Sequence, residues 1–143
     1  MNASEPQRDA SSTALGVAML REVHQTLDGD PKILNDPISG LLLDDDQRRQ
    51  IGKNPGRVHE SLAIGLRSHV VLRSRYAEER MREAAQRGVR QAVILGAGFD
   101  TFAYRQPDWA HGLRIYEVDH WGTQREKRQR LERAGITIPA NLE

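Results

Sequence analysis

The chain has 143 residues, of which 38% are hydrophobic and 29% are charged, with a formal net charge of +1 and no cysteine. This length is enough for one domain. The lack of cysteine excludes disulfides and thiolate metal sites, and the balanced charge gives no overall reason to bind nucleic acid. No apolar stretch reaches the length of a membrane span, and the first ten residues have no hydrophobic signal core. We therefore expect a cytoplasmic protein with no nucleic-acid or membrane partner.

The first elements in chain order are helical. Residues 1–11 are polar and mixed in charge, which indicates a disordered lead-in. Ser12 or Thr13 can cap a first helix, which the turn residues 28–31 end. Its apolar residues recur every four positions and predict one buried stripe: Leu15, Met19, Val23 and Leu27.

A short second helix is predicted to start at Pro37 and to include the leucines 41–43, since proline suits the first position of a helix. The acidic residues 44–46 then interrupt the pattern, and residues 53–56 form a clear break.

The pattern is helical again over about 58–87, with Gly88 as the C-terminal cap. Because this length exceeds that of an ordinary globular helix, we expect a bend near Gly65 or Ser74. The apolar positions of this helix include Leu62, Leu66, Val70, Met81 and Ala85.

The most informative segment is 93–101, where an apolar strand-like run breaks into Gly96 and Gly98. Without a Cβ atom, these residues let the backbone turn sharply and approach a ligand closely. We expect a helix from Asp100 that ends before Pro107. A second strand over 115–118 then leads to Asp119, whose carboxylate can accept hydrogen bonds from ribose hydroxyls.

A last helix over 120–134 is closed by Gly135, and residues 136–138 suggest the stub of a third strand. Strand, glycine turn, helix, strand and acid together indicate half of a nucleotide-binding fold. A tight turn without a ligand is the alternative interpretation of the glycines.

The residues after the glycines favour a ligand without phosphates. A dinucleotide fingerprint needs a third small residue where Thr101 stands, which disfavours a nicotinamide-dependent oxidoreductase. Asp100 would also place a negative charge where a pyrophosphate lies. S-adenosylmethionine fits better, because it is cationic at sulfur and its amino-acid tail suits a carboxylate and an arginine.

The sequence resembles the leucine carboxyl methyltransferase family, in particular its bacterial S-adenosylmethionine-dependent branch. The resemblance covers roughly residues 11–143. It is carried by 73–76 (Arg-Ser-Arg-Tyr), 88–101 with its Gly-Ala-Gly-Phe-Asp-Thr string, Tyr104-Arg105, 116–120 (Tyr-Glu-Val-Asp-His), Thr123-Gln124, Lys127, 12–15 and Asp36-Pro37.

The resemblance implies an α/β class I methyltransferase fold of the Rossmann-like type, truncated, with an N-terminal helical lid. Residues 12–88 would form the lid region and residues 89–143 the N-terminal half of the cofactor-binding domain. It also implies roles for single residues at the cofactor. Arg73, with Arg75 as the second choice, would grip the cofactor carboxylate; Gly96, Ala97 and Gly98 would form the cofactor loop, and Asp119 would hold the ribose.

The resulting hypothesis is an S-adenosylmethionine-dependent O-methyltransferase that acts on a carboxylate or hydroxyl of a small molecule. Because only two strands are convincing, the chain is expected either to be part of a longer enzyme or to pair with a second copy across an exposed sheet edge. A non-catalytic remnant that serves as a dimerisation or interaction module is the alternative.

The remaining polar residues have ordinary structural interpretations. The five histidines lack the paired spacing of a metal-binding helix, so no metal is expected. No catalytic residue follows from the sequence. Trp121, close to Asp119, either packs on the sheet or borders the adenosine, and His120 has the same ambiguity.

Overall fold

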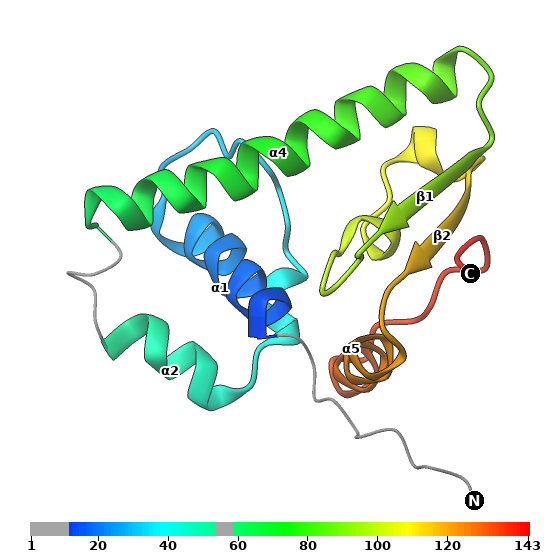
Figure 1. Ribbon diagram of the computed structural model, residues 1–143. Coiled ribbons are helices and arrows are strands. Elements are labelled where there is room, and N and C mark those ends of the chain that lie inside the picture. Colours follow the sequence, from blue (N-terminus) through cyan, green and yellow to red (C-terminus); the bar gives the residue numbers. More distant parts are fainter. Residues whose placement is uncertain (1–11, 54–58) are drawn as a thin grey trace, which may run out of the picture.

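The computed structural model describes residues 12–53 and 59–143 as a mixed helix and strand structure around a small parallel sheet (Figure 1). Strand β1 (Gln91–Leu95) pairs in parallel with β2 (Arg114–Val118), from Gln91 opposite Arg114 to Leu95 opposite Val118. This confirms an α/β structure with a parallel sheet.

The helices pack mainly against one another beside this sheet. Helix α1 (Ser12–Leu27) packs against the long helix α4 (Ser61–Gln86), and the 3-10 helix η1 (Ser39–Leu42) packs between α1 and α5 (Trp121–Arg133). In Figure 1, α4 crosses above α1, and α5 runs below the sheet. Two short 3-10 helices, η2 (Phe102–Tyr104) and η3 (Asp108–Ala110), fill the connection from β1 to β2.

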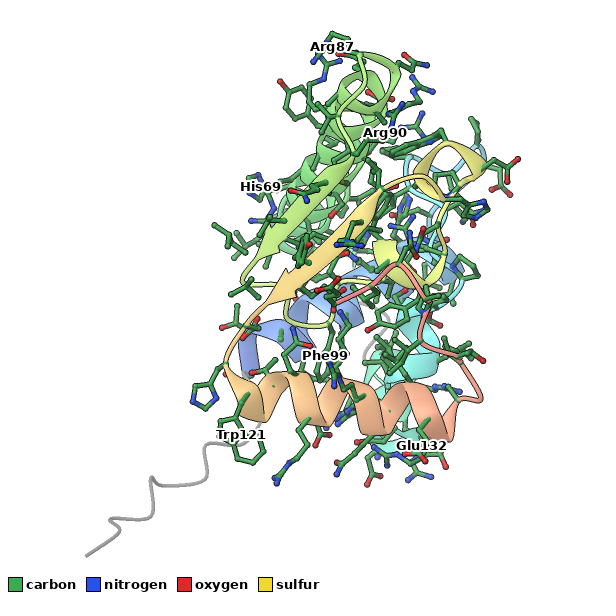
Figure 2. All side chains as sticks on the ribbon, turned by 90° about the vertical axis from the view of Figure 1, so that its right-hand side faces the viewer. His69, Arg87, Arg90, Phe99, Trp121 and Glu132 are labelled. Atoms are coloured by element: carbon green, nitrogen blue, oxygen red, sulfur yellow. The ribbon has the colours of Figure 1, made fainter. Side chains whose placement is uncertain are left out.

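Two apolar clusters make up the core. One joins α1, η1 and α5 through Ala18, Leu42, Phe99 and Leu131, among others. The other lies between the sheet and the β1–β2 connection and contains Phe102, Ala103, Ala110, Leu113 and Ile115. Figure 2 shows Phe99 in the interior, above α5. The glycine turn that contains Phe99 is therefore anchored in the core.

The predicted first and last helices are confirmed, as is the helix end at Gly88, where φ is +98°. The predicted buried stripe of α1 is wrong at its end, since Leu27 is 46% exposed. Ser61–Gln86 is one uninterrupted helix, and Figure 1 does not show the bend expected in α4. Leu62 on its first turn is 83% exposed. The break predicted at 53–56 lies mostly outside the described residues.

The segment after η1 differs from the expectation. Helix α2 (Asp45–Lys53) begins where the acidic run suggested an interruption. Asp44 caps it reciprocally: the Gln47 N–H donates to Asp44 Oδ1 at 2.8 Å, and the Asp44 N–H donates to Gln47 Oε1 at 2.9 Å. The helix expected from Pro37 is shorter and is a 3-10 turn.

The third strand-like segment lies later than predicted. Residues 136–138 form no strand, and Leu142 instead makes a parallel bridge with Ile115 of β2. The Ile115 N–H donates to the Asn141 carbonyl and the Glu143 N–H to the Ile115 carbonyl, each at 2.8 Å. The connection after α5 thus returns to the free edge of β2.

In the described ranges, no helix combines the length and the apolar character that a membrane crossing requires.

Candidate functional site: the glycine turn and its pocket

The glycine turn joins the ends of both strands. Gly96 and Gly98 have φ values of +62° and +52°, a left-handed conformation that other L residues adopt at a cost. The Ala97 N–H donates to the Val118 carbonyl at 3.2 Å, and the Gly98 N–H donates to Asp119 Oδ2 at 2.6 Å. The predicted glycine turn and the acid at the end of the second strand are therefore in direct contact.

Each glycine is required for a different reason. A Cβ atom at Gly98 would lie 3.2 Å from the Ala14 Cβ, so this residue permits the close approach of α1. A Cβ atom at Gly96 would meet no protein atom within 4 Å. Gly96 thus leaves open space beside the turn, as a close ligand requires.

Asp119 has two structural hydrogen bonds and remains able to make more. Its Oδ2 accepts from Gly98 and its Oδ1 accepts from the His120 N–H at 2.6 Å. Each carboxylate oxygen offers about two acceptor positions. Asp119 can therefore hold the turn and still accept hydrogen bonds from a ligand.

A pocket of about 710 Å³ opens between this turn, α1, α4 and β1. Its volume is within the range of small-molecule sites, roughly 300–1,000 Å³. All five residues predicted to bind a cofactor line it: Arg73, Gly96, Ala97, Gly98 and Asp119. Residues that the sequence did not single out for ligand binding also contribute, notably Thr13, Arg21 and Ser74.

The structure separates the two candidate arginines of α4. Arg73 lines the large pocket, is exposed, and makes no ion pair or hydrogen bond with another described residue. Arg75 lines a different cavity of about 260 Å³ on another side of the helix and pairs with Glu79 at 2.8 Å. Only Arg73 is thus placed to meet a ligand in the large pocket.

The segment after the turn is less helical than predicted. Asp100 begins no α-helix: its Oδ1 accepts from the Phe102 N–H at 2.9 Å, and only the three-residue helix η2 follows. In the described structure, no α-helix therefore starts directly after the turn, where the helix of a dinucleotide-binding unit would receive the pyrophosphate.

Asp100 also pairs with a buried arginine of α1. Arg21 Nη2 donates to Asp100 Oδ2 at 2.8 Å and to Ser74 Oγ at 2.7 Å. Burial raises the pKa of the Asp100 carboxyl, but the charge and the hydrogen bond of Arg21 outweigh burial and leave that pKa below its usual value. Asp100 is therefore an ionised carboxylate on the wall of the pocket.

Asp36 extends this network away from the pocket. It is fully buried, accepts from Thr101 Oγ1 at 2.7 Å and lies 3.4 Å from Arg21 Nη1 and 3.5 Å from Arg105 Nε. Arg105 in turn pairs with Glu78 of α4. Thr101, the residue that argued against a dinucleotide ligand, thus belongs to this hydrogen-bonded network.

A family model described as leucine carboxyl methyltransferase matches residues 14–143. The chain belongs to the leucine carboxyl methyltransferase family.

Similar proteins carry consistent names. The Bacillus subtilis protein "Putative S-adenosyl-L-methionine-dependent methyltransferase YktD" is 31% identical over 95% of this chain and 51% of its own length. Two proteins named "Putative S-adenosyl-L-methionine-dependent methyltransferase", from Mycobacterium avium and Frankia alni, are 33% and 31% identical, over 90% and 92% of this chain and 43% and 48% of their own lengths. The chain spans about half the length of the curated relatives it matches.

Further residues of the family resemblance form a buried cluster below the sheet. Lys127 of α5 is fully buried and donates to both carboxylate oxygens of Glu117 at 2.7 Å, and its Nζ lies 5.0 Å from the centre of the Tyr104 ring. Burial lowers the pKa of Lys127 and raises those of Glu117 and Tyr104. In this family member the cluster fixes α5 to β2.

The two ambiguous residues after Asp119 lie away from the pocket lining. His120 caps α5, its Nδ1 accepting from the Gly122 N–H at 3.2 Å. Trp121 is exposed at the start of α5, with the Arg125 guanidinium 4.5 Å from its ring (Figure 2). In the described ranges, no three His, Asp or Glu side chains gather closely enough to hold a metal ion.

Proposed function

We propose that this family member binds S-adenosyl-L-methionine in the 710 Å³ pocket and serves the transfer of its methyl group to a carboxylate or hydroxyl oxygen of a small molecule. The observation that carries the proposal is the direct contact of the glycine turn with Asp119, in a pocket whose α4 wall holds Arg73, which has no ion-pair partner among residues 12–53 and 59–143. The names of the relatives support the same cofactor.

The residues present fit the chemical groups of this cofactor. The open space at Gly96 admits a ligand close to the backbone. Asp119 keeps acceptor capacity for the ribose hydroxyls, and the Arg73 guanidinium suits the tail carboxylate. The ionised Asp100 favours a cation and disfavours a phosphate.

S-adenosyl-L-methionine, when bound, supplies a methyl group on a sulfonium centre that is already an excellent leaving group. The protein then has to hold an acceptor oxygen in line with that methyl, since positioning alone supplies much of the rate. A carboxylate acceptor needs no general base. Membership of the leucine carboxyl methyltransferase family favours this reaction over a non-catalytic binding module.

The proposal also assigns a role to each of the two larger parts of the chain. Residues 89–143 would be the first half of a Rossmann-like cofactor domain, and the helices of 12–88 a lid over it. This division is supported by the pocket, which lies between α1 and α4 on one side and β1 with its glycine turn on the other.

In the described sheet, β1 pairs only with β2, so its other edge has no strand neighbour. Pairing of a second copy along this edge is a separate prediction, which light scattering of the purified chain tests.

Isothermal titration with S-adenosylmethionine and S-adenosylhomocysteine tests cofactor binding. We expect the wild type to bind both and Asp119→Asn to bind about tenfold or more weakly, since a hydrogen bond to a charged group contributes about 1.5–3 kcal/mol. Asparagine keeps an oxygen that can accept from Gly98, which limits the damage to the turn.

Asp46→Asn is the matched control, because Asp46 lies on α2, its side chain is exposed, and it does not line the pocket. Its affinity should equal that of the wild type. Absence of heat with the wild type, or equal affinities of wild type and Asp119→Asn, would overturn the proposal.

A further inference from the structure

The network behind the pocket carries an excess of negative charge. It contains two guanidinium groups and three carboxylates: Arg21, Arg105, Asp36, Asp100 and Glu78. The neighbouring Lys127–Glu117 pair is balanced by itself. Buried charges are normally paired, so one carboxylate of this network lacks a full counter-charge.

Asp100 is the carboxylate that is open to a ligand. Asp36 is fully buried. Glu78 also lines the pocket, but the Arg105 guanidinium holds both of its oxygens in a bidentate pair, so its charge is already matched. The Asp100 side chain is 21% exposed and lines the pocket. With one hydrogen bond recorded at each oxygen, it can still accept from a cation.

Arg21 fixes the position of this carboxylate. Its side chain is 5% exposed and is held by Ser74 of α4 and by Asp36, so it has little freedom to move. Its Nε, although buried, has no hydrogen-bond partner in the described part of the chain. The Arg21 guanidinium is thus held where it orients Asp100, although this position leaves Nε without a hydrogen bond in the described structure.

We propose that Asp100 binds the α-ammonium group of the cofactor's amino-acid tail, while Arg73 binds the carboxylate of the same tail, and that Arg21 is the positioning residue for Asp100. The inference rests on the proposed cofactor site and deepens it. Two side chains of opposite charge on one pocket select a zwitterionic tail over an uncharged or singly charged one. The bound ammonium also supplies the counter-charge that the network lacks.

The test compares ligands that differ only in the tail. Isothermal titration uses S-adenosylhomocysteine, its des-amino analogue with hydrogen in place of the ammonium, and its decarboxylated analogue. The wild-type chain should prefer S-adenosylhomocysteine to the des-amino analogue by about tenfold or more, as for a charged hydrogen bond. Asp100→Asn should reduce this preference to less than about threefold, mainly by weakening S-adenosylhomocysteine. Arg73→Gln should instead reduce the preference over the decarboxylated analogue.

Asp28→Asn is the matched control. Asp28, directly after α1, pairs with Arg67 of α4 at 2.8 Å and does not line the pocket, so this substitution breaks another partly buried ion pair without touching the site. Its preference among the three ligands should equal that of the wild type. A preference that falls equally in both variants would assign Asp100 a purely structural role and overturn the inference.

If Asp100→Asn fails to fold, the titrations of the wild type alone test the ammonium site. Equal wild-type affinities for S-adenosylhomocysteine and its des-amino analogue would overturn the ammonium site while leaving the cofactor proposal intact. Binding of none of the three ligands would instead overturn the proposed function itself.

Discussion

Replacing Asp36 by alanine tests whether the buried network holds the glycine turn to the helices. Asp36 receives hydrogen bonds from Thr101 and from the N–H groups of Ile38 and Ser39, and lies beside Arg21 and Arg105. Alanine removes all of these at once. It also leaves two buried cations with less counter-charge.

The expected loss of stability depends on which ion pairs Arg21 and Arg105 keep in the variant. Removing one member of a buried ion pair costs about 3–5 kcal/mol. Arg21 keeps Asp100 and Arg105 keeps Glu78, so we expect a loss near the lower end, about 3 kcal/mol. Asp36→Asn keeps an acceptor oxygen but not the charge, and should cost about 1–2 kcal/mol.

Urea unfolding followed by circular dichroism measures both losses. Domains of this size have about 5–15 kcal/mol of stability, so a 3 kcal/mol loss gives a large shift of the midpoint. Asp46→Ala, which removes an exposed ion pair with Arg49, should change stability by less than about 0.5 kcal/mol. A loss below about 1 kcal/mol for Asp36→Ala would refute the assigned role of the network.

Three other substitutions give independent tests. Lys127→Met should cost about 3–5 kcal/mol in urea unfolding, because it leaves the Glu117 carboxylate buried without its cation, whereas Lys127→Met with Glu117→Gln should recover at least about 1.5 kcal/mol; equal losses in the single and double variants would contradict this. Gly65→Ala, inside α4 where a Cβ atom meets nothing within 4 Å, should raise the unfolding free energy by about 0.5–1 kcal/mol, and a loss would show a contact that the fold does not predict. The hydrogen bond from Arg67 lowers the folded pKa of Asp28 below its ordinary 3.8, so the stability from this carboxylate is fully present above pH 3.8 and disappears as the pH falls through the folded pKa. Asp28→Asn should therefore lose less stability than the wild type between pH 5 and 3 in the same assay, and parallel curves would exclude this linkage.

The parts of the site that the sequence could predict are encoded locally. An apolar run that stops at Gly96 and Gly98 specifies a strand and a left-handed turn, because few other residues adopt positive φ. Asp119 follows a second strand directly, and parallel strands bring their carboxyl ends to the same edge. The contact between Gly98 and Asp119 is thus a consequence of short-range patterns.

The charged network could not be predicted in the same way. Arg21 and Asp100 are 79 residues apart, and Asp36 and Thr101 are 65 apart. Each is a common surface residue when judged by type and spacing. Their burial depends on how α1 and α4 pack beside the turn, and no local pattern encodes that packing.

Helix α2 is a different case, because the local sequence does contain the signal for its start. Asp44 and Gln47 have the spacing of a capping box, yet three consecutive acids favoured the interpretation of a loop. The third strand-like segment was misplaced for another reason. Ile136 and Ile138 have the apolar character of a strand, but the backbone of 141–143 is the part that reaches β2.

The network also joins ligand binding to the packing of the helices. Arg21 comes from α1, Ser74 from α4, and Asp100 from the loop after the glycine turn, and the three meet at one guanidinium. A ligand ammonium that binds Asp100 therefore affects the Arg21 guanidinium, which Asp36 also contacts. Asp36 does not line the pocket, yet Asp36→Ala should weaken binding of S-adenosylhomocysteine under conditions where the variant is still folded. Unchanged affinity in a destabilised variant would show that the helices and the ligand site are energetically independent.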